Sequence, residues 1–113
     1  MHELGITENI MDIALDKAKE AQASKISRIN LVVGELSGFV SDCIEFYFEF
    51  LSKDTIAQGA KLYFEAVPLQ LRCRSCSMAF HPQDTLWSCP ECQSQSVEVV
   101  GGRELYIESL EVE

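Results

Sequence analysis

The sequence predicts an α+β (α/β-like) fold, in which a small mixed β-sheet carries two helices and a cysteine-rich segment is inserted between strands. Three observations support this class. Apolar residues recur at helical spacing in two separate segments. Alternating apolar and polar residues mark strands on both sides of the insert. Four of the five cysteines fall in the insert, as two closely spaced pairs. The insert is therefore expected to project from one end of the sheet.

The N-terminal part of the chain is expected to form a helix, a strand and a tight loop. Apolar side chains recur every three or four positions in residues 4–22, which favours a helix. They alternate with mostly polar side chains in residues 26–33, which favours a strand. Gly34 and Gly38 enclose the loop that follows, and glycine permits a tight path or a close approach of two backbone segments.

A second helix is predicted over residues 42–52. Asp42 followed by Glu45 resembles a capping box, with Ser41 as the competing N-cap residue. Most of the other side chains are apolar, apart from a narrow polar side that includes Glu49. A helix of this composition is either buried between layers or part of an interface, and burial is the favoured interpretation.

The C-terminal part is expected to be built from strands. Residues 61–67 alternate in polarity and lead into the insert. After the insert, residues 97–100 and 104–112 are predicted to form a strand hairpin turned by Gly101-Gly102. The apolar positions of the last strand change phase at Ser109. A β-bulge at this residue would let the apolar side chains on both sides of it face the core.

The insert carries the strongest chemical signal. Cys73-Arg74-Ser75-Cys76 and Cys89-Pro90-Glu91-Cys92 are separated by twelve residues, which is the pattern of a tetrahedral four-thiolate zinc site. Each pair can form one turn that aims two sulfur atoms at a common point. We therefore predict a closed, structural Zn²⁺ site. Its ligands are Cys73, Cys76, Cys89 and Cys92. Iron in the same ligands and a pair of redox dithiols are the alternatives.

Composition excludes several classes of function. The net charge is −9, from 18 acidic and 9 basic residues, which argues against nucleic acid as a partner. No apolar run is long enough to span a membrane, and the N-terminus has no basic region like that of a signal peptide. Cysteines in metal-ligand spacing then favour a reducing, cytoplasmic location. No catalytic constellation is present, so an enzyme is not predicted.

The N-terminus offers a second candidate metal site. A histidine at position 2 can chelate a metal through the terminal amine of Met1, a backbone amide nitrogen and the imidazole of His2. Such fused rings favour square-planar Ni(II) or Cu(II), and Glu3 could add a further ligand. On spacing alone, a chance histidine is the more frequent explanation. His81, inside the insert, is expected at the surface or beside the zinc ligands, with exchange into the zinc site as the alternative. Cys43 is expected in the core.

The chain resembles the HypA/HybF family of nickel metallochaperones, which act in the maturation of [NiFe]-hydrogenase. The resemblance covers essentially the whole chain in the same order. The matching motifs are Met1-His2-Glu3, Val33-Gly34-Glu35-Leu36, Thr55-Ile56-Ala57-Gln58-Gly59-Ala60-Lys61-Leu62, and the two Cys-x-x-Cys pairs. The combination of four cysteines with an N-terminal Met-His-Glu is specific, and it strengthens the nickel interpretation of His2.

The resemblance implies a nickel-binding α/β domain formed by residues 1–70 and 95–113, and a zinc-binding domain formed by residues 71–94. It implies labile, transported Ni²⁺ at the N-terminus together with structural Zn²⁺. The implied nickel-binding residues are Met1, His2 and Glu3, with Asp42 as the candidate for an additional carboxylate ligand.

The resemblance also implies the partners. A GTPase of the maturation pathway would act with this protein to transfer nickel to the precursor of the [NiFe]-hydrogenase large subunit, and in some organisms urease maturation factors would be served. The alternative function is a zinc-ribbon adaptor that binds a protein partner and carries no working metal.

Overall fold

The structure is a computed structural model that describes residues 3–83 and 87–113 and divides into two compact units. The ranges are Met1–Val32, Phe39–Glu65 and Leu105–Glu113 for unit 1, and Val33–Gly38 and Ala66–Glu104 for unit 2. The predicted zinc-binding segment, residues 71–94, lies inside unit 2, which is longer at both ends and also includes an earlier loop. No helix of the described residues is both long and apolar enough to cross a membrane.

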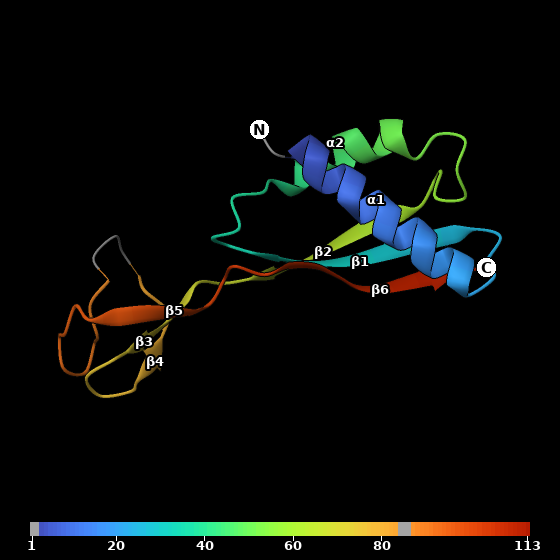
Figure 1. Ribbon diagram of the computed structural model, residues 1–113. Helices are drawn as coiled ribbons and strands as arrows, with labels where there is room; N and C mark the ends of the chain where they lie inside the picture. The colour runs from blue at the N-terminus through green and yellow to red at the C-terminus, as the bar shows by residue number, and fades with distance from the viewer. Residues whose placement is uncertain (1–2, 84–86) are drawn as a thin grey trace. The chain divides into compact units, whose positions relative to one another are not determined.

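Unit 1 is built on a three-stranded sheet with two helices on one face (Figure 1). The strand order is β2-β1-β6, with β1 (Ile26–Gly34) in the centre between β2 (Lys61–Val67) and β6 (Leu105–Val112). The helices α1 (Glu3–Glu20) and α2 (Ser41–Leu51) pack against each other. β1 and β2 each continue into unit 2 at their C-terminal ends.

The strand β6 runs antiparallel to β1. At one end the backbone N–H of Glu113 donates to the carbonyl oxygen of Lys25 at 2.8 Å. At the other end the N–H of Gly34 donates to the carbonyl oxygen of Glu104 at 2.6 Å. The residue numbers therefore fall along one strand as they rise along the other, which is the antiparallel pattern.

The strand β2 runs parallel to β1. Near the start of both strands the Arg28 guanidinium lies over the Tyr63 ring, 3.5 Å from its centroid. At the other end, the N–H of Glu35, which directly follows β1, donates to the carbonyl oxygen of Val67, the last residue of β2, at 2.8 Å. A parallel pair needs a long connection, and α2 lies in this one. The mixed sheet with two helices confirms the predicted fold class.

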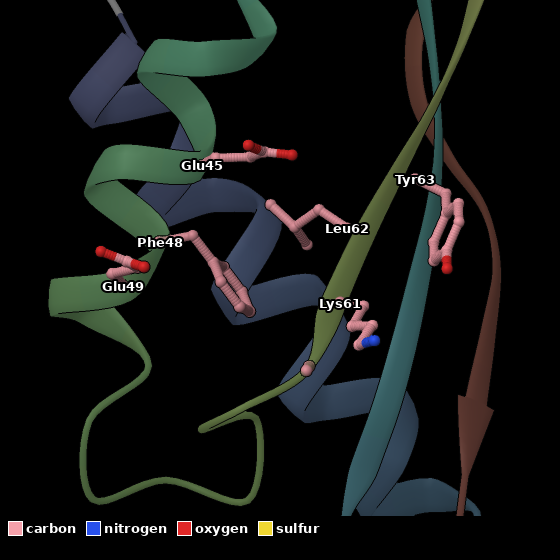
Figure 2. Close-up of a pocket in the computed structure, with 7 residues that line it drawn as sticks. Glu45, Phe48, Glu49, Lys61, Leu62 and Tyr63 are labelled. Atoms are coloured by element: carbon pink, nitrogen blue, oxygen red, sulfur yellow. The ribbon is translucent and has the colours of Figure 1, made fainter.

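The core of unit 1 lies between the helices and the sheet. The helical repeat places one face of α1 inward. Residues from both faces of β1 are buried, since Leu31 and Val32 are neighbours in the chain. In Figure 2, Phe48 of α2 and Leu62 of β2 point toward each other, whereas Tyr63 points to the other side of its strand. The buried apolar side chains of these elements are Ile10, Met11, Ala14, Ala18, Ile26, Ile29, Leu31, Val32, Ile44 and Phe48.

Unit 2 contains a second, smaller sheet. Its strands are β3 (Gln70–Cys73), β4 (Ala79–Phe80) and β5 (Val97–Gly101), in the order β4-β3-β5. Both pairings are antiparallel, and Leu71 of β3 is opposite Phe80 on one side and Val99 on the other. The buried cluster is small. It consists of Leu69, Leu71, Cys73, Phe80 and Cys89.

Two predictions about α2 are wrong. The helix begins at Ser41 with Val40 as N-cap and no side-chain cap bond, so Asp42 is not part of a capping box. Asp42 lies instead in the first turn, where its charge interacts favourably with the positive end of the helix dipole. The helix is not buried between layers either. Only one face of α2 is buried, through Ile44 and Phe48.

The predicted hairpin after the insert is also wrong. The strands β5 and β6 belong to different sheets, so the chain leaves one sheet and enters the other across Gly101-Gly102. Gly102 has a φ of 110°, which a residue with a Cβ rarely adopts. The glycine pair therefore redirects the chain instead of closing a two-stranded turn.

The loop of residues 33–38 is fastened to the rest of unit 2 by backbone hydrogen bonds. In addition to the bond from Gly34 to Glu104, the N–H of Leu36 donates to the carbonyl oxygen of Gly102 at 2.6 Å. A Cβ on Gly34 would overlap the carbonyl group of Gly102. The two backbone segments can approach this closely because neither position has a side chain.

Gly34→Ala should therefore destabilise the protein by about 1–3 kcal/mol, because a methyl group must be forced between two backbone segments. Gly5→Ala in α1 is the matched control, since a Cβ there meets nothing within 4 Å. We expect the control to be about 0.5–1 kcal/mol more stable than the parent. Denaturant unfolding of the metal-loaded proteins measures both, and equal stability of the two variants would contradict this packing account.

Candidate metal centre

The first cysteine pair is held by a tight turn at the end of β3. Cys73 is the last residue of the strand, and its N–H donates to the carbonyl oxygen of Met78 at 2.8 Å. The N–H of Ser77 donates back to the Cys73 carbonyl oxygen at 2.9 Å, and Ser77 has the left-handed φ of 67° that reverses the chain. Within this turn the N–H of Ser75 points at the Cys73 Sγ at 3.3 Å. The sulfur is thus fixed by backbone geometry.

The second pair repeats the same local structure. The N–H of Cys89 donates to the carbonyl oxygen of Ser94 at 2.9 Å, and the N–H of Gln93 donates to the Cys89 carbonyl oxygen at 2.8 Å. Gln93 has a φ of 64°, as Ser77 does in the first turn. The N–H of Glu91 lies 3.4 Å from the Cys89 Sγ. Two equivalent turns therefore present their sulfur atoms to each other.

The four sulfur atoms converge on one point. The Sγ atoms of Cys73 and Cys92 are 3.5 Å apart, as are those of Cys76 and Cys89. All four atoms lie within 4.8 Å of one another. A tetrahedral ion with metal–sulfur bonds of about 2.3 Å separates its ligands by about 3.8 Å, which this arrangement accommodates. The four cysteines can hold a metal ion.

The cluster has a covered side and an open side. Cys73 and Cys89 are buried, and Cys76 and Cys92 are exposed. Within the described residues, this metal-capable group contains no histidine and no carboxylate. Four sulfur ligands fill a tetrahedral ion, so the composition is that of a closed site and leaves no position for a substrate.

The two cysteines of the first turn differ in acidity. The N–H of Cys76, followed by that of Ser75, lowers the pKa of the Cys73 thiol to about 6 against the opposing effect of burial. The N–H of Met78 also acts to lower the pKa of Cys76, but the hydrogen bond with the Cys89 sulfur and burial together raise it to about 12. The Cys73 sulfur therefore favours the thiolate form, which accepts a hydrogen bond. The Cys76 sulfur favours the thiol form, which donates one.

The second turn shows the same division. The N–H groups of Cys92 and Glu91 lower the pKa of Cys89. The pKa of Cys92 is raised, because the effect of Cys73 and burial exceeds the lowering effect of the Ser94 N–H. Without a metal, each thiolate-prone sulfur therefore faces a protonated one. A divalent ion would replace the shared protons, which makes its binding compete with protonation.

His81 lies outside the sulfur cluster. Its Nδ1 is 2.9 Å from the carbonyl oxygen of Leu69, and a carbonyl can only accept, so Nδ1 carries the proton. The same residue, Leu69, donates its N–H to the Glu35 carboxylate at 3.1 Å. Glu35 of the Val33-Gly34-Glu35-Leu36 motif thus has a structural role that the residue pattern alone does not reveal.

The predicted nickel-binding residues are only partly described by the structure. Met1 and His2 lie outside the described residues. Glu3 is the first residue of α1 and is 7% exposed, and the Val40 N–H is among the backbone donors to its carboxylate. The start of α1 is therefore next to the start of α2, whose first turn carries the exposed Asp42.

One further expectation is corrected. Cys43 is exposed, not in the core, because it lies on the outer side of α2. The neighbouring aromatic residues favour burial, but they lie on two faces of the helix, with Phe48 buried and Phe46 and Phe50 exposed.

Comparison with known proteins gives the family. The sequence model described as "Hydrogenase/urease nickel incorporation, metallochaperone, hypA" matches residues 1–112. The chain belongs to the HypA family. The HypA maturation factor of Dehalococcoides mccartyi (strain CBDB1) is 50% identical over 113 residues, which are 100% of this chain and 95% of that protein. The HypA of Caldanaerobacter subterraneus subsp. tengcongensis is 38% identical over 114 residues, which cover 100% of both chains.

Two solved HypA structures share this fold. The solution structure of HypA protein has a TM-score of 0.77 at 28% identity and covers 99% of this chain and 96% of that one. The solution structure of the Ni metallochaperone HypA from Helicobacter pylori has a TM-score of 0.68 at 27% identity, with coverage of 99% and 97%. The HypA family is one of hydrogenase maturation factors and nickel metallochaperones, not a family of enzymes.

Removal of the metal by a chelator should unfold unit 2 and leave unit 1 folded. The buried cluster of unit 2 is small and includes two of the four cysteines, whereas the core of unit 1 contains none of them. Hydrogen exchange should show that amides of β3, β4 and β5 lose protection while those of α1 and β1 keep it. Protection retained in β3 after complete metal removal would contradict the assignment of the cluster as the organising element.

Proposed function

We propose that this protein binds Ni(II) at its N-terminus and delivers it to the [NiFe]-hydrogenase large-subunit precursor. The observation that carries the proposal is the HypA match over residues 1–112, in a chain that begins Met1-His2-Glu3. A maturation GTPase of the same pathway is the proposed partner in delivery, and urease maturation factors are further recipients. The protein works in the cytoplasm, where its cysteines stay reduced.

The proposed nickel site uses nitrogen ligands close together in the chain. The amine of Met1, the backbone amide nitrogen of His2 and its imidazole form fused chelate rings around one ion. Strong-field nitrogen ligands in such rings favour the square-planar geometry of Ni(II). Because these ligands lie at a chain end, they can leave the ion one at a time, which suits transfer to a receiving protein.

Glu3 is proposed to contribute its backbone nitrogen rather than its carboxylate. The carboxylate is nearly buried and already accepts from the Val40 N–H. Asp42 is the proposed carboxylate ligand when one is needed, because it is exposed in the first turn of the neighbouring α2.

The four cysteines are proposed to hold structural Zn²⁺, with His81 beside the site. Four thiolates suit zinc and leave no open position through which nickel could be passed on. His81 keeps its lone pair on Nε2 when Nδ1 donates to Leu69. That nitrogen is the one that could enter the zinc site if a cysteine were displaced.

His2→Ala should weaken nickel binding at least about 100-fold from the micromolar range, equivalent to about 2.8 kcal/mol, because the imidazole and its chelate ring are lost. Isothermal titration of untagged protein with Ni(II) measures the change, and zinc content should remain one ion per chain. His81→Ala is the matched control and should bind nickel like the parent. Unchanged nickel affinity in the His2 variant with zinc intact would rule out the proposed site.

Nickel affinity should also fall steeply as the pH decreases. The imidazole, the amine and at least one amide nitrogen must all be deprotonated to bind, so each pH unit lost below about 6.5 costs at least tenfold in affinity. Competition titrations with a chromophoric chelator between pH 5.5 and 8 test this. An affinity that is independent of pH would indicate carboxylate ligands in place of nitrogen ligands.

A further inference from the structure

The outer face of α2 carries large apolar side chains that the fold does not bury. Phe46 and Phe50 lie one helical turn apart and are each 56% exposed. Their rings meet edge to face, with centroids 5.1 Å apart. Val40, at the start of the helix, is 53% exposed. We refer to Phe46 and Phe50 as the α2 ridge.

The α2 ridge is bordered by acidic side chains. Asp42, Glu45 and Glu49 are all exposed, and α2 contains no basic residue. Glu45 and Glu49 also line a shallow groove of about 320 Å³ between α2 and β2, where Figure 2 shows them on the helix side. Lys61 is the basic residue among the groove's lining. The surface therefore combines aromatic rings with a local excess of negative charge.

Charge decides which occupant fits this surface. A second copy of the chain would bring the same three carboxylates against each other, and each copy carries a net charge of −9. Anionic lipid and nucleic acid are disfavoured for the same reason. The complementary surface is apolar and bordered by Lys or Arg. Lys53 already places its ammonium group 5.6 Å from the Phe50 ring centroid, so this ring accepts a cation.

We propose that the α2 ridge is a docking surface for a partner protein that presents an amphipathic helix with leucine-like side chains and a lysine- or arginine-rich border. A contact confined to this ridge is expected to be transient, because permanent interfaces bury roughly 2,000 Å² or more in total. Its biological role rests on the proposed function, since a metallochaperone must meet the protein it serves. The contact itself needs no nickel.

The test uses a synthetic helical peptide of leucine and lysine, with a leucine and glutamate peptide of the same pattern as comparison. Each is titrated into full-length, zinc-loaded, nickel-free protein, and binding is followed by backbone amide NMR. We expect saturable binding of the lysine peptide, with the largest shifts in α2, and no binding of the glutamate peptide. Because nickel is absent, failure here is distinguishable from failure of the nickel site.

Matched variants distinguish peptide binding at the α2 ridge from attraction to the overall negative charge of the protein. Phe46→Ser with Phe50→Ser should weaken peptide binding about 30-fold or more, whereas Tyr106→Ser, which removes an aromatic ring 51% exposed on β6, should change it less than about twofold. Glu45→Lys with Glu49→Lys should weaken it about tenfold or more, and Glu98→Lys on β5 should not. Circular dichroism verifies that each variant is folded.

Several outcomes would overturn the proposal. The first is that Glu98→Lys weakens peptide binding as much as the α2 charge variants do. The second is that the double phenylalanine variant binds the peptide like the wild type. The third is that the largest amide shift changes lie outside α2. Sedimentation that shows dimerisation abolished by Phe46→Ser would assign the ridge to a second copy instead. Binding of the protein to anionic phospholipid vesicles through the same residues would assign it to a membrane surface.

Discussion

The convergence of four sulfur atoms is the constraint on which unit 2 depends. Its sheet consists of short strands, and three apolar side chains and two cysteines make up its buried cluster. A core of this size cannot offset the conformational entropy of folding without a further cross-link. Each cysteine pair sits on a turn whose backbone N–H groups point at sulfur. A metal ion that binds all four thiolates joins the two turns and supplies the missing free energy.

The core of unit 1 contains none of the four cysteines, and under the proposed function this difference separates the two metals within one chain. Its helices cover one face of a three-stranded sheet with a continuous apolar core. The proposed nickel ligands are Met1 and His2, with Glu3 at the start of α1 and Asp42 in the first turn of α2. In the proposed account, thiolate ligands keep zinc permanently because the closed site has no entry. In the same account, the nitrogen ligands near the N-terminus take up and release nickel.

The amino-acid sequence predicts those features that depend on local pattern. The helix of α1, the strand β1 and the four-cysteine cluster all follow from residue spacing. Features that depend on which segments meet in space could not be predicted. The Gly101-Gly102 pair predicts a hairpin turn, but the strands on either side of it belong to different sheets. The aromatic residues of α2 predict a buried helix, but Phe46 and Phe50 face outward because the helix packs through its other face.

The central claim is that nickel and zinc occupy chemically different sites in one chain. X-ray absorption at the nickel and zinc edges of a single, doubly loaded, untagged sample tests it most directly. The account predicts nickel with nitrogen and oxygen ligands in a planar arrangement, and zinc with four sulfur ligands near 2.3 Å. Nickel with sulfur ligands, or zinc with fewer than four sulfur atoms at pH 7, would contradict it.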